Sequence, residues 1–230
     1  MRAIEPQIKT LVPAEIHDDP RDLLTSIGSS EALPGISSLV SGAGFKQVHD
    51  LPSLEAFLEQ YIADILVPLE LPAVLSAWQF TEDHHVRELI DLDNELLNNE
   101  RLKPFRAASC AVGRRQLSKL RPLRDHRVIQ RYWGAMDEGR AAAWHTLVYG
   151  ILTSTYSIPL RQSLVQLSQQ TLAGFTLSAV TSLKLGLQAS RAMLIRRNAD
   201  LPPAVNELLR HTPTASPSIF TAQISGPAIT

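Results

Sequence analysis

The stretch LRQSLVQLSQQTLAGFTLSAVTSLKLGL, from Leu160 to Leu187, is the longest apolar-periodic segment of the chain. Its leucine, valine and phenylalanine residues recur at spacings of three and four, which is the period of an α-helix. The polar residues between them are mostly serine, threonine and glutamine rather than charged residues, so we expect this helix to be buried on more than one side. The segment therefore predicts a helical core and an all-α fold.

The same helical period recurs through the rest of the chain, whereas alternating strand patterns are weak throughout. Ser53 is expected to be the N-cap of a helix that ends near Pro68 and Pro72. Leu187–Arg197 is expected either to continue the long helix or to form a separate one after Gly186. Further helices are predicted over residues 21–30, 72–80, 84–98, 101–120 and 140–155. The whole pattern predicts a single-domain multi-helix bundle of about 8–10 helices.

Three regions follow from composition. Residues 1–20 contain three prolines and an acidic pair, which predicts an irregular N-terminal arm. Residues 21–211 form the predicted helical domain, interrupted by a glycine- and serine-rich loop at Leu33–Gly44. Residues 212–230 are rich in proline, serine and threonine with few charges, which predicts a flexible tail.

The overall composition is that of an ordinary globular protein: 230 residues, 44% hydrophobic, 20% charged, with a net charge of −1. Cys110 is the only cysteine, so an intrachain disulfide is impossible and a reducing compartment is expected. The N-terminal sequence lacks the apolar run of a signal peptide, and the apolar stretches are interrupted by proline or glutamate. We therefore expect a cytoplasmic protein with no membrane partner.

Charge is divided between two neighbouring segments. Residues Asp50–Glu100 contain twelve acidic residues and one basic residue, whereas residues Arg101–Arg131 contain ten basic residues and one acidic residue. Neighbouring helices that complement each other would explain this division, and so would a basic face that binds a partner protein. Nucleic-acid binding is disfavoured, because the basic residues are not interleaved with aromatic residues and the acidic segment would repel phosphate.

No pattern of catalytic, cofactor-binding or metal-binding residues is found. His84 and His85 follow two acidic residues, but adjacent helix positions point about 100° apart and cannot share one ion. We expect this segment to be a solvated helix start, with Thr81 or Asp83 as its N-cap. His145 lies in a helix that is expected to be internal, so we interpret it as a packed, hydrogen-bonded residue. A Gly-x-Ser-x-Gly motif does not occur, and the pair of Glu-x-x-His motifs on two helices that a di-iron bundle needs is not found.

Four blocks taken together resemble the UreF family of urease accessory proteins. They are residues 91–97 (DLDNELL), 105–117 (FRAASCAVGRRQL), 144–150 (WHTLVYG) and 177–186 (LSAVTSLKLG). No single block is specific, but their order and spacing over residues 22–195 resemble the family pattern. The chain departs from that pattern at Lys46, where the family has an acidic residue, and at Ser182, where it usually has an arginine. The family's closing segment has no evident match in residues 219–230.

The resemblance implies a non-enzymatic assembly factor. UreF proteins bridge a UreD/UreH protein, which binds the urease apoprotein, and the GTPase UreG, which carries nickel for insertion into urease. The resemblance also implies a homodimer that needs no cofactor of its own. Two alternatives are a helical interaction module with a different partner and a helical enzyme of the haem-oxygenase-like or ferritin-like kind.

The candidate partner-binding residues lie in two places. Those in the glycine-rich loop and just after it are Ser41, Gly42, Gly44 and Lys46, and those on the basic helix are Arg106, Arg114 and Arg115. An ordinary flexible turn and solvated, internally paired arginines are the structural alternatives. The loop and the segment after Pro202 are expected to be the parts that become ordered when a partner binds.

Overall fold

The computed structural model describes residues 48–119 and 126–211. Within those ranges it contains eight α-helices and no strand, which confirms the all-α prediction. The α-helices are α4 (Leu51–Tyr61), α5 (Leu71–Glu82), α6 (Val86–Asn98), α7 (Arg106–Lys119), α8 (Arg127–Asp137), α9 (His145–Thr155), α10 (Leu160–Leu183) and α11 (Leu187–His211). A π-helical segment, η2 (Ile62–Glu70), joins α4 to α5, and a short 3-10 turn, η3 (Lys103–Phe105), precedes α7.

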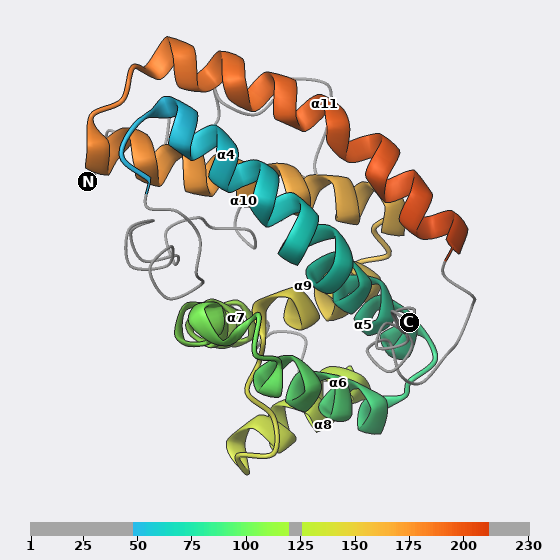
Figure 1. Ribbon diagram of the computed structural model, residues 1–230. Coiled ribbons are helices and arrows are strands. Elements are labelled where there is room, and N and C mark those ends of the chain that lie inside the picture. The colour runs from blue at the N-terminus through green and yellow to red at the C-terminus, as the bar shows by residue number, and fades with distance from the viewer. Residues whose placement is uncertain (1–47, 120–125, 212–230) are drawn as a thin grey trace, which may run out of the picture.

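The helices form two groups around α9 (Figure 1). The continuous rod α4–η2–α5 crosses the molecule, with the hairpin of α10 and α11 on one side and α6, α7 and α8 on the other. Helix α9 contacts members of both groups, including α5, α7 and α10. It therefore joins the two halves of the bundle.

The α4–η2–α5 rod corrects a predicted boundary. Pro68 was expected to end a helix, but the chain continues through it, and the N–H of Leu71 donates to the carbonyl of Leu66, five residues back. Proline lacks an N–H and crowds the carbonyl four residues before it. The wider π-helical turn accommodates both effects, and the helix continues without a break.

The rod also corrects the prediction that no apolar stretch reaches the length of a membrane span. Residues Leu51–Glu82 form one helix of 32 residues that is long and apolar enough to cross a membrane by length and composition alone. Its most apolar window is 61% buried inside the protein. Packing within the bundle therefore accounts for the apolar composition of this helix.

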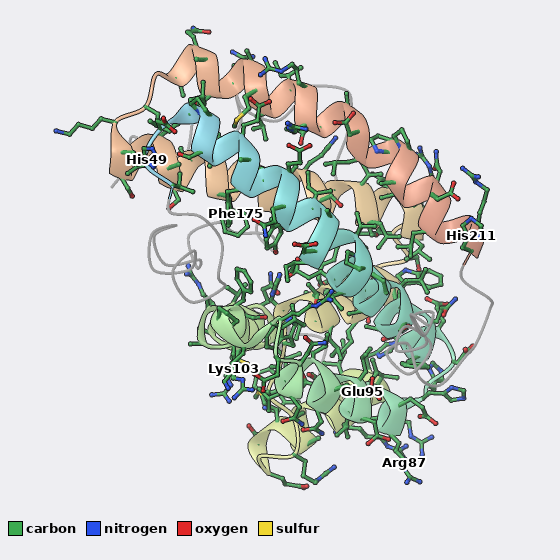
Figure 2. The ribbon with its side chains drawn as sticks, in the orientation of Figure 1. His49, Arg87, Glu95, Lys103, Phe175 and His211 are labelled. Carbon is green, nitrogen blue, oxygen red and sulfur yellow. The ribbon has the colours of Figure 1, made fainter. Side chains whose placement is uncertain are left out.

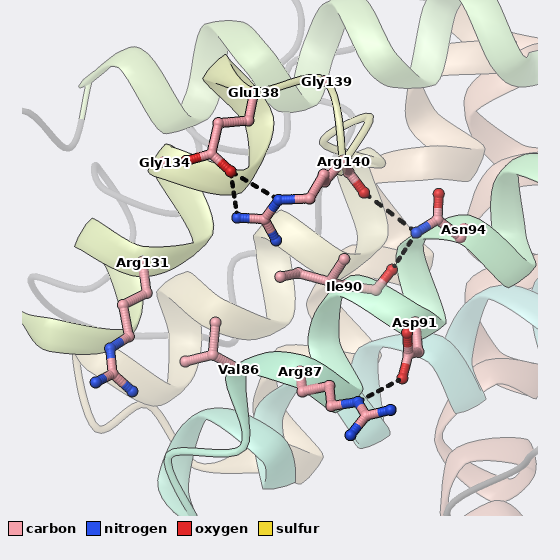
Figure 3. Close-up of a pocket in the computed structure, with 10 residues that line it drawn as sticks. All are labelled: Val86, Arg87, Ile90, Asp91, Asn94, Arg131, Gly134, Glu138, Gly139 and Arg140. Carbon is pink, nitrogen blue, oxygen red and sulfur yellow. Dashed lines mark hydrogen bonds and ion pairs between the residues drawn. The ribbon is translucent and has the colours of Figure 1, made fainter.

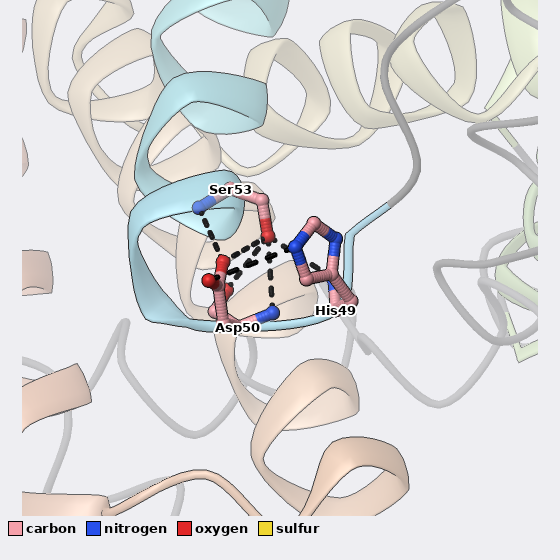
Figure 4. Close-up of polar contacts among 3 residues, drawn as sticks. All are labelled: His49, Asp50 and Ser53. Atoms are coloured by element: carbon pink, nitrogen blue, oxygen red, sulfur yellow. Dashed lines mark hydrogen bonds and ion pairs between the residues drawn. The ribbon is translucent and has the colours of Figure 1, made fainter.

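The N-cap of α4 lies three residues before the predicted cap (Figure 4). Asp50 is the N-cap and its Oδ1 accepts from the N–H of Ser53 at 2.9 Å, while Ser53 Oγ accepts from the N–H of Asp50 at 3.0 Å. This reciprocal pair is a capping box, so Ser53 serves as its third helical residue and not as the cap. Hydrogen bonds from Ser53 lower the pKa of the Asp50 carboxyl.

The predicted start of the helix over residues 84–98 is two residues early and its predicted cap is wrong, although His84 and His85 are exposed as expected. Thr81 is buried in the last turn of α5, where its Oγ1 donates to the carbonyl of Ala77 at 2.7 Å. Asp83 caps the end of α5, and His84 has a left-handed backbone with φ of 60°. Helix α6 begins only at Val86 because this turn separates it from α5.

Three further boundaries differ from the predictions. Helix α9 begins at His145, and the preceding residues form an irregular segment instead of a helix from residue 140. Helix α10 ends at Leu183, where Lys184 adopts a left-handed backbone with φ of 54°, so α11 is a separate helix. Helix α11 continues through Pro202 to His211, so the residues from Pro202 to His211 are helical without a bound partner. Helix α8 was not predicted from the sequence.

Aromatic residues from three elements, α4, η3 and α10, form the centre of the core. Phe175 on α10 lies 4.8 Å from Tyr61 and 5.1 Å from Phe57, measured between ring centroids (Figure 2). Phe105 packs edge-on against Tyr61 at 5.7 Å. These tilted and edge-to-face contacts are the favoured geometry for aromatic pairs. They attach α10 to the α4–η2–α5 rod, as the apolar period of Leu160–Leu187 predicted.

Candidate functional site: the basic helix and its buried anchor

Helix α7 presents one face to α9 and the other to solvent. The buried face contains small and apolar side chains at helical spacing: Ala108, Ser109, Val112, Gly113, Gln116 and Leu117. At Gly113 the backbones come so close that a Cβ atom would lie 1.8 Å from the carbonyl oxygen of Ala143. Only glycine allows this approach, so this position sets how deeply α7 sits against the segment before α9.

Asp93 on α6 anchors that segment from the other side. Its carboxylate is fully buried and accepts from the backbone N–H groups of Ala142 at 2.5 Å, Ala143 at 2.9 Å and Trp144 at 2.9 Å. The hydroxyl of Tyr132 on α8 donates to the same carboxylate at 2.9 Å. Four donors thus compensate one buried charge and connect α6, α8 and the start of α9.

Ser109 on α7 completes the joint, by which we mean the contacts of Asp93, Ser109 and Gly113 that hold α6, α7 and α8 against the segment before α9. Its Oγ accepts from the backbone N–H of His145 at 3.1 Å and lies 2.7 Å from Nδ1 of the same histidine. Burial lowers the pKa of His145 to about 4, which favours a neutral ring. The tautomer of that ring decides whether Nδ1 accepts from the Ser109 hydroxyl or donates to its second lone pair. His145 is therefore the packed, hydrogen-bonded histidine that the sequence predicted.

The three predicted arginines on α7 have different surroundings. Arg114 and Arg115 are adjacent and exposed, and successive helix positions point about 100° apart. Arg106 is half-buried, and one of its terminal nitrogens donates to the carbonyl of Leu97 at the end of α6. The structure thus leaves Arg114 and Arg115 exposed on α7, pointing in different directions, whereas Arg106 joins α7 to α6.

The acidic and basic segments meet at the junction between α6 and α7. Among the described residues, Lys103 and Glu100 form an ion pair at 3.4 Å, and Arg106 binds the end of α6 as noted. Elsewhere the acidic side chains of α4 pair with α11: Arg197 lies 3.3 Å from Glu55 and 3.4 Å from Glu59. The carboxylates of α4 are thus partly compensated by arginines of α11. The division of the sequence into an acidic segment, 50–100, and a basic segment, 101–131, did not suggest this pairing.

The predicted loop residues Ser41, Gly42, Gly44 and Lys46 lie outside the described residues, so their role stays a prediction. The described ranges contain no group of three or more histidine, cysteine, aspartate or glutamate side chains that could hold one metal ion. Cys110 is half-buried on α7, and burial raises the pKa of its thiol, which disfavours the reactive thiolate.

A second buried acid lies in the core away from this joint. Glu70, in the π-helical segment, accepts from the hydroxyl of Tyr61 at 2.7 Å. Burial raises the pKa of Glu70 to about 7, and the Tyr61 hydrogen bond offsets only part of that effect. The folded protein therefore holds this proton more tightly than the unfolded chain, whose glutamate titrates near 4.5.

This difference predicts a pH-dependent effect of the Glu70→Gln substitution. The stabilising effect of the proton is complete below pH 4.5 and is lost as the pH rises to about 7. Glutamine has no such loss, so the free energy of unfolding of Glu70→Gln relative to wild type should increase by on the order of 3 kcal/mol across that window. Urea unfolding followed by circular dichroism between pH 4.5 and 7.5 measures this difference.

The exposed Glu59→Gln substitution on α4 is the matched control for loss of a carboxylate that is not buried, and its difference from wild type sets the baseline. A constant difference between Glu70→Gln and wild type would show that Glu70 has the same pKa in the folded and the unfolded protein. That result would contradict the burial argument.

Sequence reasoning missed the two residues that build the joint. Asp93 lies among the other acids of α6 and was counted only as part of the acidic segment. Its position four residues after Leu89 and three before Leu96 places it on the buried stripe of α6, which was the available signal. Ser109 appeared only within the quoted block, and its contact with His145 depends on the tertiary fold.

Comparison with known proteins adds one positive finding. A family model described as UreF matches residues 48–197. The match begins just before α4 and ends within α11, so it includes the α6–α9 joint and the basic helix. A search of curated proteins returns no match.

Proposed function

Since the chain belongs to the UreF family of urease accessory proteins, we propose that it is the non-enzymatic factor that bridges a UreD/UreH-like protein and the UreG-like GTPase. In this role it supports nickel insertion into the urease apoprotein without binding the nickel or a cofactor through a site of its own. It acts in the cytoplasm as a homodimer. Its contribution is to hold two partners in a fixed relative position.

The family match over residues 48–197 carries this proposal. It is continuous from α4 to α11, so it covers the whole joint in which Asp93, Ser109 and Gly113 position α7. Helix α7 presents the exposed pair Arg114 and Arg115 on that rigid support. Charged groups on a well-supported helix provide specificity and fast association with an acidic partner.

Reversing the charge of both arginines is the direct test of this surface. The double substitution Arg114→Glu and Arg115→Glu should weaken binding to one of the two partners by about tenfold or more, because attraction is replaced by repulsion. Isothermal titration calorimetry against each purified partner measures the effect. Arg191→Glu on the exposed side of α11 is the control and should leave both affinities unchanged.

The function itself is tested by complementation. The gene is deleted from its urease-producing host, and urease activity is measured in nickel-containing medium with and without the full chain restored. We expect activity to fall on deletion and to return with the wild-type chain. Full urease activity in the deletion strain, with the other accessory proteins present, would contradict the proposed role and favour a module with a different partner.

A further inference from the structure

A groove of about 810 Å³ lies between α6 and α8 (Figure 3). Its floor contains the partly exposed side chains of Val86 and Ile90, one turn apart on α6. Gly134 on α8 faces them and leaves the groove open, since a Cβ atom at this position would have no atom within 4 Å. The groove is large enough for several side chains of a bound segment.

The rim of the groove carries five charges. Arg87 pairs with Asp91 at 3.9 Å, and Arg140 pairs with Glu138, whose carboxylate accepts from Arg140 Nε at 2.7 Å. Both carboxylates on the rim are therefore already matched to an arginine. Arg131 has no carboxylate partner among the described residues, so the rim has one positive charge in excess (Figure 3).

The floor is held in place by the backbone around it. Asn94 on α6 donates through Nδ2 to the carbonyl of Arg140 at 3.2 Å and to the carbonyl of Ile90 at 2.9 Å. These bonds join α6 to the segment after α8. The groove is therefore a preformed part of the fold, which reduces the ordering cost of binding.

We propose that this groove binds an acidic amphipathic helix of a partner protein. Aliphatic side chains one turn apart on that helix would pack on Val86 and Ile90, and a carboxylate beside them would pair with Arg131. The combination of an apolar trough and a charged rim is the common mode by which grooves recognise helices. The residues that line the groove do not include the arginine pair of α7, so this site can be tested independently of the proposed urease role.

The test is photo-crosslinking of the full chain in its host. The amino acid p-benzoylphenylalanine replaces Gly134, where an added Cβ atom would have no neighbour within 4 Å. The same amino acid in place of Ala199, exposed on α11 at the far side of the molecule, is the control. After illumination, mass spectrometry identifies the crosslinked peptide.

The expected product is a segment of another protein in which an acidic residue lies within one helical turn of aliphatic residues. Adding Arg131→Glu should reduce its yield about tenfold, whereas Arg131→Lys should retain most of it. A product with a second copy of this chain, with its own residues or with nucleic acid would overturn the proposal. So would a yield at Gly134 no higher than at Ala199, or one that Arg131→Glu leaves unchanged.

Discussion

Asp93→Ala is expected to reduce the free energy of unfolding by about 4 kcal/mol or more, because four buried donors lose their acceptor together. Three of those donors are backbone N–H groups of residues 142–144 and the fourth is the Tyr132 hydroxyl. Backbone groups cannot rotate towards new partners. The segment before α9 should therefore loosen, and with it the docking of α7.

Chemical denaturation measures the loss of unfolding free energy in Asp93→Ala. The variants Asp93→Asn and Asp91→Asn show whether that loss is specific to the buried carboxylate. Asp93→Asn retains one acceptor oxygen and the side-chain volume, so its cost should lie between wild type and Asp93→Ala. Asp91 lies two residues away and is exposed, and its ion pair with Arg87 at 3.9 Å is a surface pair. Such pairs contribute little, so Asp91→Asn should change the free energy of unfolding by less than about 0.5 kcal/mol. Equal effects of Asp93→Ala and Asp91→Asn would refute the anchor.

Gly113→Ala is expected to cost about 3 kcal/mol or more, because its Cβ would overlap a backbone oxygen and not a movable side chain. Relief requires α7 and the segment of Ala143 to separate by more than an ångström. That movement would stretch the hydrogen bond between Ser109 and His145. Since α7 also carries Arg114 and Arg115, the variant should lose partner binding as well as stability.

Gly134→Ala is the matched control, because Gly134 also lies within a helix but has no atom near its missing Cβ. Alanine is the better helix former, so this variant should be as stable as wild type or more stable by up to about 1 kcal/mol. Thermal unfolding of both variants separates the two effects. A Gly113→Ala protein as stable as Gly134→Ala would show that the close approach to Ala143 does not occur.

The sequence was sufficient for the fold class because helical periodicity is a local property. The stripe of Leu160–Leu187 predicted a buried helix, and Phe175 within it occupies the centre of the aromatic core. The same reasoning placed α6 and α9 in about the right positions and interpreted His145 correctly. The resemblance over four blocks was confirmed by the family match.

Boundaries failed where the backbone departs from regular geometry. Proline is a reliable helix breaker only for an α-helical turn, and the π-helical segment around Pro68 removes the clash on which that rule depends. His84 and Lys184 adopt left-handed conformations at the ends of helices, although glycine is the usual residue there. Neither residue type signals such a turn in a sequence.

The candidate site was predictable only in part. Arg114 and Arg115 are on the surface as a partner-binding role requires, but no local pattern showed that Arg106 would turn back to the end of α6. The groove between α6 and α8 could not be predicted because α8 itself was missed. The signal for α8 was present in the sequence, because apolar residues recur there at helical spacing. The structure buries that stripe, which consists of Val128, Ile129, Tyr132 and Ala135.

The bridging role is tested most directly by reconstitution. The full chain is mixed with the purified UreD/UreH-like and UreG-like proteins of its host, with GTP, and the mixture is separated by size-exclusion chromatography with light scattering. We expect one complex that contains all three proteins, with two copies of this chain, and no association of the two partners when this chain is omitted. Separate elution of this chain, or a UreD/UreH–UreG complex that forms equally well without it, would contradict the bridging role.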